Sequence, residues 1–143
     1  METYDHKQVS PWLLLLLFAV AGAVAVALAV SAPLLAIPVL ILIVVLAFMF
    51  SAMSTHVDRR GVSWAFTLGF PSGMIPFADI GDVEITKTHF WEGYGIHWTI
   101  WHGWLWNVGG YRGVMIRKRS GGRITLGTDD PQGLYDAIAR LRT

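Results

Sequence analysis

The sequence predicts an α+β protein, with an N-terminal transmembrane helical hairpin followed by a β-rich domain that ends in one helix. Three observations predict it. Residues 11–53 contain no charged residue. From about residue 54 apolar and small or polar residues alternate with a period of two, which is typical of strands with one buried face. The last residues place apolar side chains at helical spacing, as in an amphipathic helix.

Composition excludes several classes of protein. The chain has 143 residues, enough for one domain and a membrane hairpin. It contains no cysteine, which excludes disulfides, cysteine metal sites and thiol nucleophiles. The formal net charge is +1, so bulk charge gives no support to a nucleic-acid partner, and we expect none.

The uncharged stretch is about twice as long as the roughly 20 apolar residues that one helix needs to cross a bilayer. The break Ser31-Ala32-Pro33 near its middle predicts helices over about 11–30 and 34–51, after a polar N-terminal segment at 1–10. Pro11 suits a first helical turn, and Trp12 would lie at the membrane interface. A cleaved signal peptide is disfavoured, because the apolar region of a signal peptide is only about 7–15 residues long and this apolar stretch is much longer.

Positive charges predict the orientation of this hairpin. Lys7 precedes the first helix, Arg59 and Arg60 follow the second, and the turn between the helices has no Lys or Arg. By the positive-inside rule, the protein is a multi-pass protein of the cytoplasmic membrane with both termini cytoplasmic. Neither span contains an ionisable residue, which argues against a transporter or pump.

Small residues recur along the first helix. Ala19, Ala23 and Ala27 are four residues apart, and Gly22 lies beside them. Such a stripe allows close packing of helices, within the hairpin or between protomers, although an alanine-rich span without a partner gives the same pattern.

The remaining residues, 55–143, predict a cytoplasmic domain of six or seven short antiparallel strands and one helix. Gly103 indicates a bulge or a bend in its aromatic stretch. Asp130-Pro131 is typical of a helix start, with an N-cap acceptor and proline at the first position. The aromatic residues at 89–95 predict a loop, and strands are expected near 55–58, 62–70, 80–87, 96–108, 114–119 and 123–127.

Several segments of this domain resemble bacterial pleckstrin-homology-like domains. The segment at 75–80, IPFADI, is similar to their "I-P-x-x-D-I" stretch, and 124–134 is similar to their "I-G-T-D-D-P-x-x-L" junction between the last strand and the helix. Residues 95–110 resemble their central strands. The resemblance covers about residues 55–142 and implies a pleckstrin-homology-like antiparallel barrel or sandwich with a C-terminal capping helix. It also implies a small bacterial inner-membrane protein with two helices before the domain and a scaffold role.

Basic and aromatic residues supply the candidate contact surfaces. Five cations lie close together without an acid among them, and they would either face anionic lipid or form an ordinary solvated hairpin: Arg112, Arg117, Lys118, Arg119 and Arg123. Alternation places Trp98, Trp104 and Trp106 in the core. Trp91 and Trp101 fall in a loop and on the opposite strand face, so they are the candidates for contact with lipid or a partner.

Catalytic and metal-binding motifs are not evident. The sequence has no nucleophile elbow, no phosphate-binding glycine loop and no zinc pattern. His97 and His102 fall on opposite faces of a regular strand, and Asp129 and Asp130 suit helix capping. We therefore expect no catalytic residue, no metal and no cofactor.

These observations leave three hypotheses. The first is a membrane-anchored, non-catalytic interaction module that binds a protein partner, a second copy of itself, or anionic lipid headgroups. The second is an accessory subunit of a membrane enzyme or transporter, docked through its helices. The third is an enzyme whose site residues are dispersed in the sequence.

Overall fold

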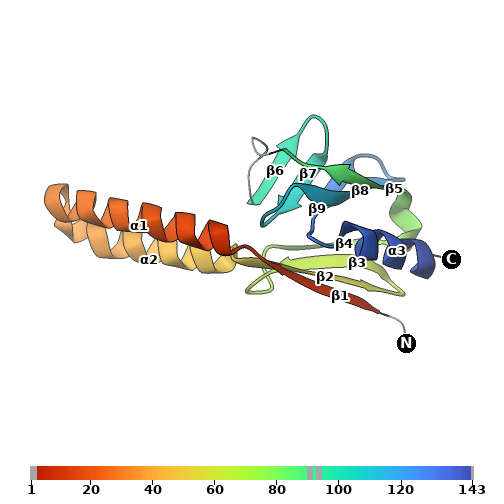
Figure 1. Cartoon of the computed structure of the whole chain (residues 1–143), viewed down its shortest axis with the longest axis horizontal. Coiled ribbons are helices and arrows are strands. Elements are labelled where there is room, and N and C mark those ends of the chain that lie inside the picture. Colours follow the sequence, from red (N-terminus) through yellow and green to blue (C-terminus); the bar gives the residue numbers. More distant parts are fainter. Residues whose placement is uncertain (1–2, 90–91, 93–94, 143) are drawn as a thin grey trace.

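The computed structural model describes residues 3–89, 92 and 95–142. Two long helices project from one end of a domain made of two sheets and a third helix, and both chain termini lie away from the helix tips (Figure 1). The elements are β1 (Tyr4–Val9), α1 (Pro11–Ser31), α2 (Pro33–Met49), β2 (Ala52–Asp58), β3 (Gly61–Phe66), β4 (Ser72–Pro76), the short 3₁₀ helix η1 (Phe77–Asp79), β5 (Ile80–Lys87), β6 (Gly95–Thr99), β7 (Gly103–Asn107), β8 (Arg112–Lys118), β9 (Arg123–Gly127) and α3 (Pro131–Leu141).

The helical pair is an insertion between two neighbouring strands. β1 precedes α1, β2 follows α2, and the two strands pair antiparallel from Tyr4↔Val57 to Val9↔Ala52. The segment 1–10 was expected only to be polar, yet most of it is a strand of the domain. Its side chains fix it there: the Tyr4 hydroxyl donates to Asp130 at 3.1 Å, His6 lies 2.5 Å from Asp129, and the Gln8 amide donates to the Gly109 carbonyl at 2.6 Å.

The two helices differ in length. α1 has 21 residues, and among the described residues it is the one helix long and apolar enough to be a membrane-span candidate; α2 is equally apolar but has 17 residues. Both start with proline, and Ser10 caps α1 by accepting from the Leu13 N–H at 3.3 Å. Ala21 and Ala47 are the buried residues of the pair, and most of the larger side chains are exposed.

The strands form two sheets. The first has the order β1-β2-β3-β4, and the second has the order β5-β8-β9-β7-β6. An antiparallel barrel or sandwich was expected; the structure has two sheets, and the second is mixed, because β7 and β9 pair in parallel. Six or seven strands were expected after α2, and the described residues form eight. One reason is that Gly103, at φ +67, divides the aromatic stretch into β6 and β7.

The C-terminal helix α3 was predicted and is confirmed. Asp130 caps it by accepting from the Gly133 N–H at 3.0 Å, and Pro131 holds the first position. Leu134, Ala137 and Ile138 are buried against β2, β5 and β8. The core therefore lies between the two sheets and is closed on the β1–β5 side by α3.

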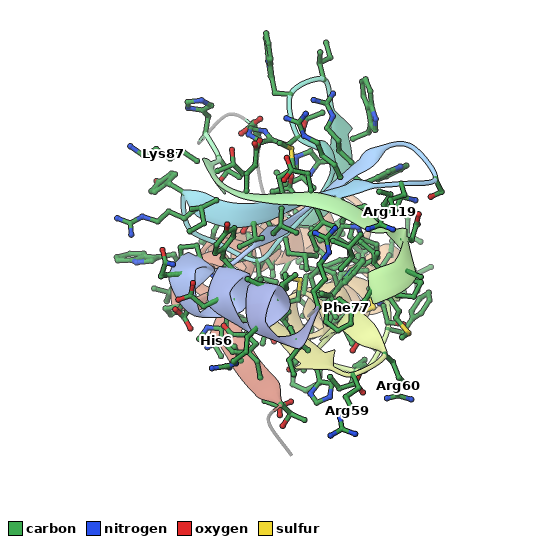
Figure 2. All side chains as sticks on the ribbon, turned by 90° about the vertical axis from the view of Figure 1, so that its right-hand side faces the viewer. His6, Arg59, Arg60, Phe77, Lys87 and Arg119 are labelled. Atoms are coloured by element: carbon green, nitrogen blue, oxygen red, sulfur yellow. The ribbon has the colours of Figure 1, made fainter. Side chains whose placement is uncertain are left out.

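The domain has a proximal end, where α1 and α2 attach, and a distal end opposite. At the distal end the Phe77 N–H donates to the Arg60 carbonyl at 3.3 Å, and the Arg119 N–H donates to the Asp79 carbonyl at 2.7 Å. The turns after β2 and β8 therefore lie together. Figure 2, which faces this end, shows Arg59, Arg60 and Arg119 there.

Candidate interaction surface

Two tryptophans that alternation assigned to the core are exposed. Trp98 and Trp104 lie directly opposite each other on β6 and β7, with 60% and 51% of their surface exposed. Trp106 is the one that enters the core, where its ring lies 5.4 Å from that of Trp64 in an edge-on arrangement. The prediction for Trp98 and Trp104 is therefore wrong.

The side chains of Trp98 and Trp104 do point to the inner face of the second sheet, but they lie beyond the part of that face that the first sheet and α3 cover. Strand pairing aligns Ile116, Ile124, Trp104 and Trp98 in one row across the second sheet, so all four face the side of the core. Exposure rises along this row: Ile116 is fully buried, Ile124 is half-buried, and the two tryptophans are open. The row ends at β6, the edge strand, on the side that α3 leaves uncovered.

The tip of the β6–β7 hairpin adds two more exposed apolar residues. Ile100 is 67% exposed and Trp101 is 73% exposed. The Arg123 guanidinium donates to the Trp101 carbonyl at 3.1 Å and to the Ile100 carbonyl at 2.9 Å, which fixes the tip. We call these residues, with the exposed pair, the tryptophan surface: Trp98, Ile100, Trp101 and Trp104. Trp91, the other predicted contact residue, lies outside the described residues.

The predicted basic group is divided between the two ends of the domain. Arg117, Lys118, Arg119 and Arg123 surround the β8–β9 turn at the distal end. Arg112, the first residue of β8, lies near the proximal end. Gly110, two residues before it, lies close to the side-chain amide of Gln8, at the end of β1 that leads into α1. Arg117 lies 3.5 Å from Glu84. The hydrogen bonds from Ser120 lower the pKa of Asp79, which anchors the β8–β9 turn.

Apolar side chains surround the proximal end. Trp12 is 77% exposed at the start of α1, and Leu68 and Phe70 are exposed in the β3–β4 loop. That loop is tied to the helices, because the Thr67 N–H donates to the Met49 carbonyl at 3.2 Å. A largely apolar cavity of about 320 Å³ lies at the same junction, lined by Leu13, Leu17, Leu46, Phe50 and Gly95.

The small-residue stripe does not face α2. Ala19, Gly22, Ala23 and Ala27 are all exposed, and a Cβ on Gly22 would meet no atom within 4 Å. The buried contact of α1 is made by Ala21 instead. The stripe therefore does not pack within the hairpin. Packing between protomers, or with another membrane protein, stays a prediction.

The sequence did not predict a buried series of hydrogen bonds that links the side chains of Glu92, His102 and Thr86. His102 Nδ1 lies 2.6 Å from Glu92 Oε1, and His102 Nε2 lies 3.2 Å from the Thr86 hydroxyl. The side chains of His102 and Glu92 are only 9% and 6% exposed. The described residues contain no group of three His, Asp or Glu side chains that could hold a metal. The sequence gives no signal for this series, because Glu92 lies in a loop and Thr86 on another strand.

Neither a protein-family model nor a curated protein matches this sequence. Function is therefore inferred from the position, exposure and charge of its residues.

Proposed function

We propose that this protein is a membrane-anchored, non-catalytic interaction module of the bacterial inner membrane. The α1–α2 hairpin crosses the bilayer twice, and the domain binds a protein partner through the tryptophan surface. The domain is a pleckstrin-homology-like scaffold. The strands-then-helix order of residues 52–141 supports this, while the parallel β7–β9 pair departs from a fully antiparallel barrel.

The apolar surface of the helices supports the membrane anchor. Large side chains are exposed along α1 and α2, among them Val30 at 86% and Leu34 at 92%. A soluble protein rarely exposes so much contiguous apolar surface. Trp12 and Phe70 lie at the proximal end, at the depth where aromatic rings favour the membrane interface.

The insertion between β1 and β2 supports the proposed topology. Because the two strands are paired, the start of α1 and the end of α2 must lie on the same side of the membrane. The N-terminus and the domain then share that side. The positive-inside rule assigns it to the cytoplasm.

The observation that carries the binding function is the exposure of four large apolar side chains at one hairpin, whose tip points away from the helices (Figure 1). Tryptophan and arginine are enriched among the residues that dominate protein–protein binding energy. Arg117 lies opposite Arg123, and the Arg123 guanidinium contacts the tip of this hairpin, so this part of the basic group lies at the distal end. This position favours a protein partner over the adjacent lipid for the larger part of the basic group.

One observation favours the accessory-subunit hypothesis as a second candidate. The stripe of Ala19, Gly22, Ala23 and Ala27 faces outward and is free to pack against a helix of another membrane protein. Replacing Ala23 and Ala27 with leucine would block that packing and leave the domain unchanged.

Site-specific photocrosslinking in cells tests the proposed function. A photoreactive amino acid replaces Trp101, and a control replaces Ser63, which lies on the outer face of the first sheet. We expect a discrete protein adduct from position 101 and none from position 63. Equal crosslinking from both, or none from position 101 in a chain that fractionates with membranes, contradicts the proposal.

A further inference from the structure

We infer that β6 is a strand-addition site, where an extended segment of the partner protein pairs with the edge opposite β7. This inference rests on the proposed function, because it specifies how the tryptophan surface binds. In the described part of the chain β6 pairs with β7 alone.

The four edge strands of the two sheets differ in their protection. Natural edge strands avoid unwanted pairing by means of charged residues, proline, short length or a covering element. β1 carries Asp5 and Lys7, and β4 ends in Pro76. β5 carries charges and a register irregularity between Ile80 and Asp82, and α3 packs against it.

β6 has none of these sequence devices. Its sequence is Gly-Ile-His-Trp-Thr, without an Asp, Glu, Lys, Arg or proline. β-Branched and aromatic residues of this kind favour pairing. The strand is therefore the one edge in the described fold whose own residues do not oppose the addition of another strand.

On the inner face of the second sheet, two rows of apolar side chains run across the strands and end at β6. One row of side chains runs Ile116, Ile124, Trp104, Trp98, and the next runs Val114, Leu126, Trp106, Ile96. Both rows begin in the buried core and end at β6, where Trp98 is exposed and Ile96 is half-buried. A strand added to β6 would supply the next side chain in each row.

This geometry defines the chemistry of the partner. Side chains in a strand alternate between faces, so the segment would carry bulky apolar residues at positions i and i+2, over Ile96 and Trp98. The residues between them would be polar, because His97 and Thr99 occupy the other face of β6. The backbone supplies affinity, and the two apolar side chains supply specificity.

Amide hydrogen exchange of the full chain in neutral phosphatidylcholine nanodiscs tests the inference. The probe is the capped peptide Glu-Thr-Val-Thr-Trp-Thr-Glu. Its control, Glu-Thr-Thr-Val-Trp-Thr-Glu, has the same composition without the alternation. At saturating probe we expect exchange at residues 95–99 to slow by about tenfold or more, because a paired amide exchanges only when the strand opens. The control peptide should leave exchange unchanged.

Two variants test whether the edge of β6 is the site of protection. Trp98→Lys removes an apolar contact and adds a cation to the edge, and it should abolish the protection. Ser63→Lys adds the same cation on the outer face of the first sheet, outside the tryptophan surface, and should retain it. Binding without protection of residues 95–99, or equal effects of the two peptides, overturns the inference. Protection that rises with protein concentration without peptide identifies a second copy as the occupant and also overturns it. Crosslinking from position 101 would still test the proposed function separately.

Discussion

The backbone N–H of Ser10 donates a hydrogen bond to the carbonyl of Ser51 at 3.1 Å. This bond extends the β1–β2 ladder by one step and joins the two ends of the helical hairpin. Because of it, the anchor and the first sheet are one continuous structure, and the domain is incomplete without the residues that precede the anchor.

The first prediction concerns that dependence on β1. Replacing residues 11–50 with Asn-Gly joins Ser10 to Ser51, the last hydrogen-bonded pair of the ladder, through a two-residue turn of the type that favours hairpins. We expect this soluble chain to fold. A chain of residues 52–143 alone should be less stable by at least about 3 kcal/mol, since it loses three side-chain hydrogen bonds worth about 1 kcal/mol each in addition to the β1–β2 ladder. Urea unfolding followed by circular dichroism measures the difference, and equal midpoints would refute the role of β1.

The second prediction concerns alkaline pH. Burial, together with the bond to Asp130, raises the pKa of Tyr4. A raised pKa in the folded state means that stability is fully present below the ordinary tyrosine value of about 10 and is lost as pH rises above it. Tyr4→Phe should lower stability at pH 7 by about 1 kcal/mol. The variant should also show a shallower loss of stability above that pH than the parent chain, as measured by urea titrations across the range.

The third prediction concerns acid pH and the distal turn. The bonds from Ser120 lower the pKa of Asp79, so the stability contributed by this carboxylate is present above the ordinary aspartate value of about 4. It is lost as pH falls through the lower folded value. Asp79→Asn should therefore flatten the acid side of the stability profile. Asp136→Asn, on the exposed face of α3, is the control that should retain the parent slope.

The fourth prediction concerns the buried series of Glu92, His102 and Thr86. Removing one partner of a buried hydrogen bond leaves the other without its bond, at a cost of about 1–3 kcal/mol. His102→Ala should destabilise the domain by this order. His56→Ala, at a half-buried position on the outer face of the first sheet, should cost far less. Similar thermal midpoints for the two variants would show that the series contributes nothing to the fold.

The fifth prediction compares the loss of stability on removing a tryptophan of the core with the loss on removing an exposed one. Trp106→Ala should cost about 3 kcal/mol or more, because the ring packs against Trp64 and Phe66 in the core. Trp98→Ala should change stability by only about 0.5 kcal/mol, as an exposed residue does. A large loss for Trp98 would show that its ring is covered in solution.

Local patterns in the sequence predicted the elements that local chemistry determines. The uncharged stretch with its proline break predicted two helices, and Asp130-Pro131 predicted the start of α3. Gly103 predicted a bulge or a bend in the aromatic stretch, and the chain turns there between β6 and β7. The strand β1 was missed because Tyr4–Val9 carries charged residues and pairs with a strand beyond the helical insertion. No periodicity within six residues reveals such a distant partner.

The candidate site was predictable only in part. Alternation assigned Trp98 and Trp104 to the inner face correctly, but their exposure depends on where the first sheet and α3 end, which the strand itself does not encode. Trp101 was expected to be free for contact, and it is exposed. The basic group was close in sequence yet divided in space, because Arg112 and Arg119 lie at opposite ends of the β8 segment.

Cysteine accessibility in oriented membrane vesicles tests the proposed insertion of the hairpin most directly. The natural chain has no cysteine, so single substitutions Thr3→Cys, Ser31→Cys and Ser120→Cys each report one position. With a membrane-impermeant maleimide, positions 3 and 120 should be labelled from the same face, and position 31 only from the opposite face. Labelling of positions 3 and 120 from opposite faces would contradict the account, because strands β1 and β2 could not then pair.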